Sequence, residues 1–145
     1  MKALILVALV LSVVAPGAEK KVKMQDLPPA VQAAVKEQTK SSTLIGLTRE
    51  VEDGKTFYEA ETKVDGHGRD VLFDTAGAVV SIEEEVALDN IPAAAKAAID
   101  KQASGGKVTK VETVTKGREV YYEAVIVKKG KSIEFSVDGS GKPVK

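Results

Sequence analysis

The sequence predicts an α+β fold built as a tandem repeat, in which each copy is one helix followed by antiparallel strands. Three observations lead to this prediction. Within residues 27–81, twelve residues are identical to the residue 64 positions later, without a gap. Each copy opens with a helical hydrophobic pattern and continues with alternating strand patterns. A copy of about 60 residues would be marginally stable alone, so we expect the two to lie side by side, with the helices on one face of a seven- or eight-stranded sheet.

The repeated residues occur where packing or backbone geometry restricts the choice of side chain. In the first copy they are Pro28, Ala30, Ala33, Ala34, Gln38, Tyr58, Glu59, Ala60, Gly66, Asp74, Gly77 and Val80. They occupy a helix start, a helix face, a central strand and two turns, which makes coincidence a poor explanation. The pattern does not decide whether the two copies share one continuous sheet.

A helix is predicted over residues 30–38 of the first copy, with apolar residues at spacings of three and four along one face. Pro28 and Pro29 suit its first turn because proline has no N–H to leave unpaired. Asp26 is the expected cap. A second helix with the same pattern is predicted over residues 91–99.

Strands are predicted after each helix, separated by turns rich in glycine and aspartate. In the first copy they cover residues 44–51, 56–64, 69–74 and 78–86, and in the second residues 108–115, 119–127 and 132–138. The alternation in the first of these leaves room for a bulge. Because Val144 lies near the end of the sequence, we expect the last strand of the second copy to be a stub.

The first 18 residues predict a secretory signal peptide. Lys2 is the positive residue, residues 3–14 are apolar, and small residues allow cleavage after Gly17 or Ala18. An apolar run of twelve is shorter than the roughly 20 residues of a membrane span. We therefore expect a periplasmic or secreted protein with no membrane span after the signal is removed.

The remaining chain divides into three predicted parts. They are a flexible lead-in at 19–26, the first repeat at 27–88 and the second repeat at 89–145. Without residues 1–18 the chain has 20 basic and 21 acidic residues, which gives it no electrostatic reason to bind nucleic acid or an anionic membrane. The sequence has no cysteine, so disulfide and thiol chemistry are excluded.

Short motifs of both copies resemble the PepSY-like family, which is grouped with the β-lactamase-inhibitor-protein fold. They are Leu27-Pro28-Pro29-Ala30-Val31, Tyr58-Glu59-Ala60 and Asp74-Thr75-Ala76-Gly77, with Ile91-Pro92-Ala93-Ala94-Ala95, Tyr122-Glu123-Ala124 and Asp138-Gly139-Ser140-Gly141. The resemblance covers nearly all of the chain after residue 18. It implies an exported, non-enzymatic domain that binds proteins or peptides, in a family associated with restraining peptidases. β-Lactamase inhibitor proteins carry disulfides, so inhibition of β-lactamases is not carried over to a chain without cysteine.

No set of residues in the sequence forms a catalytic or metal-binding motif. His67 is the only histidine, and its glycine neighbours place it in a turn without an evident nucleophile or second ligand. Asp65, Asp70 and Asp74 lack the ligand spacing of known calcium loops and are interpreted as turn residues. We therefore predict no catalytic residue, no metal ligand and no cofactor.

The run Glu83-Glu84-Glu85 has two interpretations. It could form a patch for a basic partner, or a solvated strand segment whose charge discourages edge pairing. The second interpretation is the simpler one, and we adopt it here.

One strand face is the predicted binding surface. Because strand side chains alternate, residues next to the helix-facing Tyr58 and Tyr122 must point to the opposite face. The candidate binding residues on that face are Phe57, Glu59, Glu61, Tyr121, Glu123 and Val125. Aromatic groups beside carboxylates suit recognition of a protein or peptide in the cell envelope, a peptidase being one candidate. Loops or the other copy could instead cover this face.

Two other functions were weighed against binding through this face. The first is an envelope sensor of a small ligand or cation, which would use the turns at residues 65–74 and 139–141. The second is an enzyme, which would need Glu59 and Glu123 to approach each other. Repeat symmetry explains the matching positions of these two glutamates more simply, so an enzyme ranks last.

Overall fold

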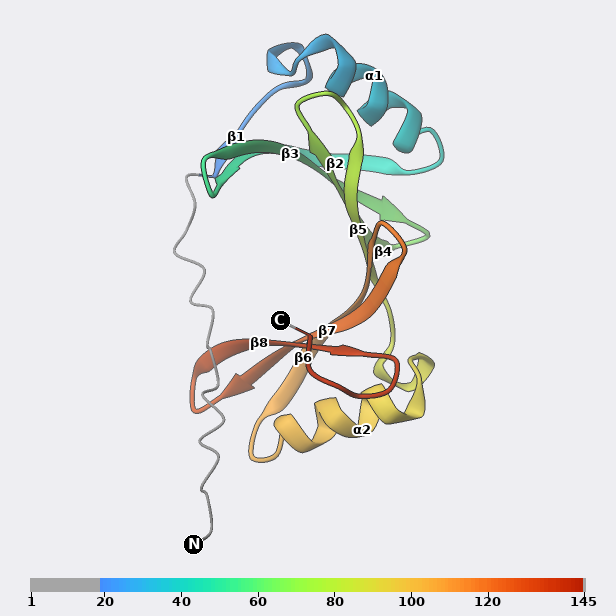
Figure 1. The fold of residues 1–145 in the computed structure, drawn as a ribbon, viewed down its shortest axis with the longest axis vertical. Helices are drawn as coiled ribbons and strands as arrows, with labels where there is room; N and C mark the ends of the chain where they lie inside the picture. Colours follow the sequence, from blue (N-terminus) through green and yellow to red (C-terminus); the bar gives the residue numbers. More distant parts are fainter. Residues whose placement is uncertain (1–18, 145) are drawn as a thin grey trace, which may run out of the picture.

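The computed structural model describes residues 19–144, which form one antiparallel sheet with two helices on the same face (Figure 1). The eight strands follow one another in chain order, and each is hydrogen-bonded to the next. The sheet curls so that both helices lie on its convex side and the opposite face is concave (Figure 1). The predicted α+β repeat is confirmed. The predicted signal peptide lies outside the described residues.

Every predicted helix and strand is present, with ends that differ by at most three residues. The first repeat contains α1 (Pro29–Gln38), β2 (Thr43–Glu52), β3 (Lys55–Val64), β4 (His67–Asp74) and β5 (Val79–Glu85). The second contains α2 (Ala93–Gln102), β6 (Lys107–Lys116), β7 (Glu119–Lys128) and β8 (Lys131–Asp138). Short 3-10 turns, η1 (Met24–Asp26) and η2 (Leu88–Asn90), precede the helices. In the described residues, neither helix has the length and apolar character needed to cross a membrane.

The N-terminal segment differs from the predicted flexible lead-in at 19–26. Its β1 (Lys20–Lys21) pairs antiparallel with β2 and covers part of that edge, and η1 follows. Asp26 caps η1 and not α1, because its carboxylate accepts the backbone N–H of Lys23 at 3.0 Å. This strand is not recognisable in the sequence, because its residues are charged and do not alternate with apolar ones. It forms only by hydrogen bonding to the edge of β2, which lies far away in the sequence.

Pairing between β5 and β6 joins the two repeats into one continuous sheet, which the sequence left undecided. The register runs from Ile82 opposite Thr115 to Glu85 opposite Glu112. At the far end, Pro143 forms a single isolated bridge with Val137 of β8. β5 is therefore an interior strand with a neighbour on each side.

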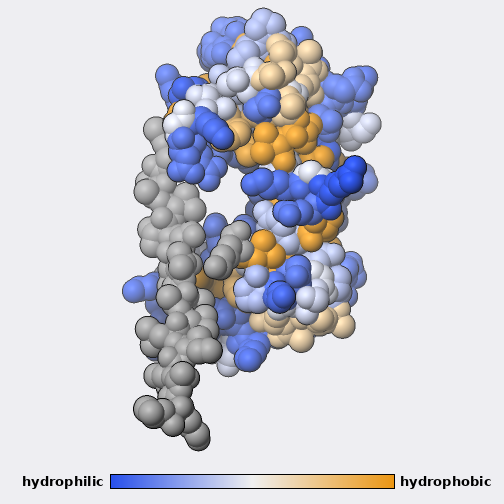
Figure 2. Space-filling model, viewed as in Figure 1, coloured by the Kyte–Doolittle hydropathy of each residue, from blue (hydrophilic) through white to orange (hydrophobic). Residues whose placement is uncertain are grey.

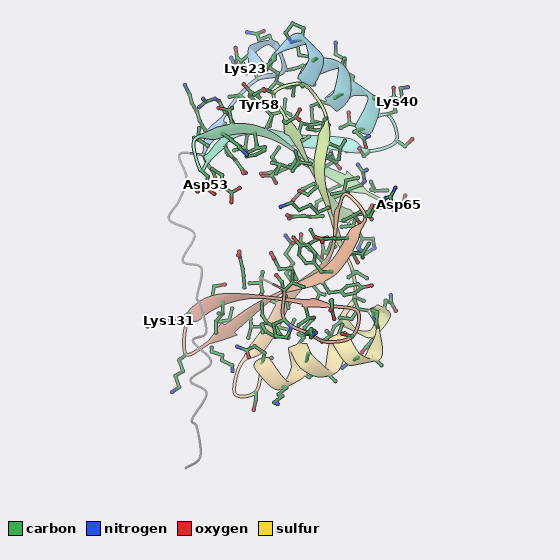
Figure 3. All side chains as sticks on the ribbon, viewed as in Figure 1. Lys23, Lys40, Asp53, Tyr58, Asp65 and Lys131 are labelled. Carbon is green, nitrogen blue, oxygen red and sulfur yellow. The ribbon has the colours of Figure 1, made fainter. Side chains whose placement is uncertain are left out.

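Two hydrophobic clusters hold the helices to the convex face, one in each repeat. The first consists of Leu27, Val31, Val35, Leu47, Tyr58, Ala60, Val71 and Phe73. The second consists of Ile91, Ala95, Ile99, Ala103, Val111, Ala124, Ile126 and Val137. Tyr58 lies between β3 and α1, as predicted (Figure 3). Each large side chain buried here stabilises the fold by about 1.5–3 kcal/mol, and this packing fixes which strand residues face away from the helices.

Candidate functional site

All six candidate binding residues lie on the concave face. Those of the first repeat project from β3 and those of the second from β7, because their neighbours in each strand pack beneath the helices. No helix or strand of residues 19–144 lies over this face (Figure 1). In Figure 2, a hollow between the two halves is bordered by hydrophobic residues, with hydrophilic residues between them.

The structure does not bring the two groups of candidates together. β4, β5 and β6 lie between β3 and β7 in the sheet. Glu59 and Glu123 thus have three strands between them, which makes four strand spacings of roughly 4.8 Å each. Their positions in the sheet therefore give no support to the close approach of these two carboxylates that an enzyme would need.

Carboxylates from both repeats stand directly opposite one another across the middle of the concave face. We call Glu61, Asp70 and Glu83 the first acidic row, and Glu85, Glu112 and Glu123 the second acidic row. The first row crosses β3, β4 and β5, and the second crosses β5, β6 and β7. Opposed side chains on antiparallel strands have Cβ atoms about 4.5–5.5 Å apart, and like charges in such pairs are destabilising. The carboxylates of each row therefore repel one another across the concave face.

A cavity of about 110 Å³ adjoins the first acidic row. Its lining residues are Glu50, Glu59, Asp70, Leu72, Ser81 and Glu83. Ser81 is only 8% exposed, so a hydroxyl is buried in the wall of a cavity that is otherwise mainly acidic. The cavity therefore offers carboxyl and hydroxyl oxygens, together with one apolar side chain.

Burial in the concave face disfavours the charged forms of these acids. Burial, together with a hydrogen bond to Glu50, raises the pKa of Glu59 from 4.5 to about 9. Burial and neighbouring carboxylates raise the pKa of Glu83 to about 7. The pKa values of Asp70 and Glu123 are also raised, chiefly by burial. At neutral pH Glu59 therefore keeps its proton and Glu83 is partly protonated.

Lys110 supplies a counterion to the second acidic row. A bulge between Val108 and Lys110 shifts the register of β6, and this places Lys110 on the concave face. Its ammonium forms an ion pair with Glu112, whose residue is only 5% exposed. The position 64 residues earlier is Gly46, which follows the equivalent bulge in β2. β2 therefore offers the first acidic row no matching lysine, although Lys110 also acts to lower the pKa values of Asp70 and Glu83 in that row.

The aspartate at the start of the β4–β5 turn, Asp74, holds the turn together. A carboxylate oxygen of Asp74 accepts the backbone N–H groups of Ala76 and Ala78, both at 2.9 Å. Gly77 has a φ of 81°, and a Cβ there would lie 2.6 Å from the carbonyl oxygen of Ala30. The turn thus rests against the first turn of α1, and only glycine fits.

The second copy repeats this arrangement. Asp138 accepts the N–H groups of Ser140 and Lys142 at 2.9 and 3.0 Å, and a Cβ at Gly141 would lie 2.5 Å from the carbonyl oxygen of Ala94. The Ser140 hydroxyl and the N–H of Lys142 lower the pKa of Asp138. These contacts give the repeated turns a structural role, so the turns lend no support to a cation sensor.

Sequence reasoning missed most of the acidic rows. It assigned Glu61 and Glu123 to the open face from the alternation of their strands, but not Asp70 or Glu112. The same alternation places these residues on that face, whereas their opposition depends on the register between neighbouring strands, and for Glu85 and Glu112 on the pairing of the two repeats. The pattern of polar and apolar residues within one strand does not specify its register with a neighbouring strand.

The interpretation of Glu83-Glu84-Glu85 as an edge-strand device is wrong. β5 is interior, so there is no free edge for these charges to protect. Glu83 and Glu85 belong to the acidic rows, whereas Glu84 is on the convex side, where its carboxylate accepts a hydrogen bond from Arg69 at 3.3 Å. Three consecutive glutamates thus serve two different surfaces.

The arrangement as a whole is suited to binding positively charged groups. In residues 19–144 no three His, Asp or Glu side chains converge in the way that metal ligands do. The carboxylates are instead spread along rows that cross several strands. Side chains bearing oxygen atoms project from both halves into the hollow between them (Figure 3).

Comparison with known proteins identifies relatives of this fold. The family described as "Putative beta-lactamase-inhibitor-like, PepSY-like" matches residues 16–80 and again residues 64–140. No curated protein sequence matches the chain.

Several solved structures from Bacteroides share the architecture. A "putative periplasmic" protein from Bacteroides eggerthii has a TM-score of 0.67 and 21% identity, over 82% of this chain and 86% of its own. A DUF2874 family protein from Bacteroides uniformis has a TM-score of 0.65 and 20% identity, over 81% and 86%. A BLIP-like protein from Bacteroides fragilis has a TM-score of 0.60 and 20% identity, over 82% and 84%. These likenesses show a common fold, and because the family match includes both repeats, the chain belongs to the PepSY-like, beta-lactamase-inhibitor-like family.

Proposed function

We propose that this protein is an exported, non-enzymatic module that holds a protein or peptide of the cell envelope on its concave face. The observation that carries the proposal is the concave face itself, which no described element covers although it forms half of the sheet surface. A sheet with helices on one side leaves its other side available for a partner. The half-buried rings of Phe57 and Tyr121 lie on this face, and aromatic residues of this kind anchor protein interfaces.

Export is supported by the pattern of residues 1–18, which is that of a secretory signal peptide. The related structure from Bacteroides eggerthii is described as periplasmic. We therefore place the protein in the periplasm or outside the cell. Because the sequence has no cysteine, the fold does not depend on the redox conditions of that compartment.

Binding is favoured over catalysis by the way the polar groups are arranged. A hydrolase needs a nucleophile with a base, or paired carboxylates around a substrate pocket. The acidic rows instead extend across the sheet, and their cavity is small at about 110 Å³. The chain belongs to the PepSY-like family, and the association of that family with restraining peptidases makes a peptidase one candidate partner.

Affinity capture tests the proposal, with the chain from Glu19 onward as bait and an envelope extract of the source organism as prey. The test variant is Phe57→Asp/Tyr121→Asp on the concave face. The control is Leu44→Asp/Val120→Asp, two apolar residues that are 37% and 47% exposed and lie on the convex side of β2 and β7. Circular dichroism checks that both variants fold.

The expected result is a partner that the wild type and the control capture and the test variant loses. Charged groups placed at an aromatic anchor remove its buried contact area and add a desolvation cost. A partner retained by the test variant and lost by the control would place the binding surface on the convex side and refute the proposal.

A further inference from the structure

We infer that the concave face binds a partner segment rich in lysine and arginine, whose basic side chains lie over the two acidic rows. This inference rests on the proposed function and adds the chemistry of the partner. Charge complementarity is its first basis. Six carboxylates face one another across five strands, and a cationic segment would convert that repulsion into attraction.

The protein itself contains an example of the interaction. The ammonium of Lys110 reaches the second acidic row and pairs with the buried carboxylate of Glu112. The equivalent place beside the first acidic row is Gly46, which has no side chain to offer. Lys110 also attracts Asp70 and Glu83 of the first row without pairing directly with either carboxylate. A lysine or arginine of the partner would give the first row a directly paired cation, as Lys110 gives the second.

The cavity beside the first acidic row provides room for such a side chain. Its volume is about 110 Å³, and Asp70 and Glu83 of the row line it together with the buried hydroxyl of Ser81. Leu72 adds an apolar contact for the methylene groups of a lysine or arginine, which pack well on apolar surface. The site therefore has both a carboxylate end and an apolar wall.

The geometry of the rows also predicts a spacing in the partner. Glu83 and Glu85 belong to different rows and are two residues apart in β5. Alternate residues of an extended strand are about 6.6–6.8 Å apart. An extended partner segment lying along β5 would therefore place basic residues at alternate positions over the first and second rows in turn.

A divalent cation is the main competing occupant. Calcium takes six to eight oxygen ligands that converge on one point. In the described part of the chain no three acidic or histidine side chains converge in this way. Rows of separate carboxylates are better matched by several basic groups spaced along a polymer.

Three labelled peptides of about 12 residues, binding to the chain from Glu19 onward, test the inference by fluorescence anisotropy. They carry Lys, Gln or Glu at alternate positions and are otherwise identical. We expect the Lys peptide to bind about tenfold or more tightly than the other two. Raising the salt concentration from about 0.05 to about 0.5 M should weaken its binding about tenfold, because salt screens exposed charges.

Variants distinguish the concave face from the rest of the surface. Glu61→Gln/Glu83→Gln should weaken binding of the Lys peptide about tenfold. The control Glu37→Gln/Asp100→Asn also removes two carboxylates, in this case from the helices, and should leave the affinity within about twofold. Removal of opposed carboxylates relieves repulsion, so the test variant is expected to fold.

Each contrary outcome has its own meaning. A Lys peptide that binds wild type and test variant equally would refute the inference. A Gln peptide that binds as well as the Lys peptide, and is lost in Phe57→Asp/Tyr121→Asp, would refute the basic partner while leaving the proposed function intact. If no peptide binds and calcium chloride raises the melting temperature of wild type but not of Glu61→Gln/Glu83→Gln, a cation is the occupant and the inference fails.

Discussion

The two repeats use the same positions on the convex side of the sheet and different residues on the concave side. Most helix-facing positions of the first cluster have buried apolar counterparts 64 residues later, such as Leu27 with Ile91 and Val35 with Ile99. Across the concave face the chemistry changes, as where Gly46 corresponds to Lys110. Packing restricts one side of each strand, because buried volume must be filled. The other side is free to differ between the repeats.

The difference shows that the acidic face is not a property of either repeat alone. The first repeat supplies the first acidic row and one member of the second, Glu85. The second repeat supplies Glu112, Glu123 and the counterion Lys110. Pairing of β5 with β6 brings these groups onto one surface. A tandem repeat can thus preserve its core while building a composite site at the junction.

Truncation of matched core residues should show the largest effect and test whether the two cores are equivalent. Phe73 and Val137 occupy corresponding positions and are both fully buried. Phe73→Ala should lower the free energy of unfolding by about 3–5 kcal/mol, because it leaves a large cavity. Val137→Ala removes two methyl groups and should cost about 1.5–2.5 kcal/mol. Urea unfolding measures both, and equal losses would show that the cores are less different than their side-chain volumes imply.

Substitution of the glycine by alanine should destabilise both Asp-x-x-Gly turns equally. This prediction tests a feature that the two repeats share. Gly77→Ala and Gly141→Ala should each cost about 2–3 kcal/mol, since each adds a Cβ at positive φ and against a helix carbonyl. Gly54→Ala is the matched control, with a φ of 75° and no atom within 4 Å of the added Cβ. Gly54→Ala should lower the free energy of unfolding by about 1 kcal/mol, measured by thermal or urea unfolding. If it lowers stability as much as the other two variants, the clash with the helix carbonyl does not cause their loss.

Titration of Glu59 and its counterpart Glu123 gives the smallest effect and separates the two concave halves. The pKa of Glu59 is raised in the folded state to about 9, so the folded protein binds more protons than the unfolded chain above pH 4.5. Stability should therefore fall as the pH rises from about 5 to about 9. Glu59→Gln should flatten this decline and stabilise the protein by about 1–2 kcal/mol near pH 9, a value reduced because solvent still reaches the group.

The matched variant Glu123→Gln should change the pH dependence less. The Ser136 hydroxyl donates a hydrogen bond of 2.9 Å to Glu123, which favours its charged form. Urea unfolding at three pH values measures the slopes. A Glu59→Gln variant whose stability falls with pH as steeply as the wild type would show that another group causes the decline.

Much of the fold was predictable because local physics determines it. Helix 29–38 follows from its proline start and apolar periodicity, and β3 from its clean alternation around Tyr58. The short β1 was not predictable, since two lysines become a strand only through the edge of β2. The role of Asp26 was misjudged for a similar reason, because its acceptor geometry depends on η1.

The candidate site was predictable in its orientation and not in its composition. Alternation alone put Phe57 and Tyr121 on the open face, and the structure places both there. The sequence analysis treated Glu83 only as part of a run of three glutamates, and it interpreted the run as protection of a sheet edge. Only the position of β5 between β4 and β6 makes that residue part of a row.

The sequence by itself determined the repeat, the order of the helices and of the strands β2 to β8, and the faces of residues in regularly alternating strands such as β3 and β7. These features follow from periodicity, turn residues and glycine, which act over a few positions along the chain. The tertiary structure alone decided the continuous sheet, the acidic rows and the pairing of Lys110 with Glu112. Strand register brings charged residues of the two repeats within a few ångströms of one another. The interaction energy of two charges depends on the distance between them and is larger where they are partly buried.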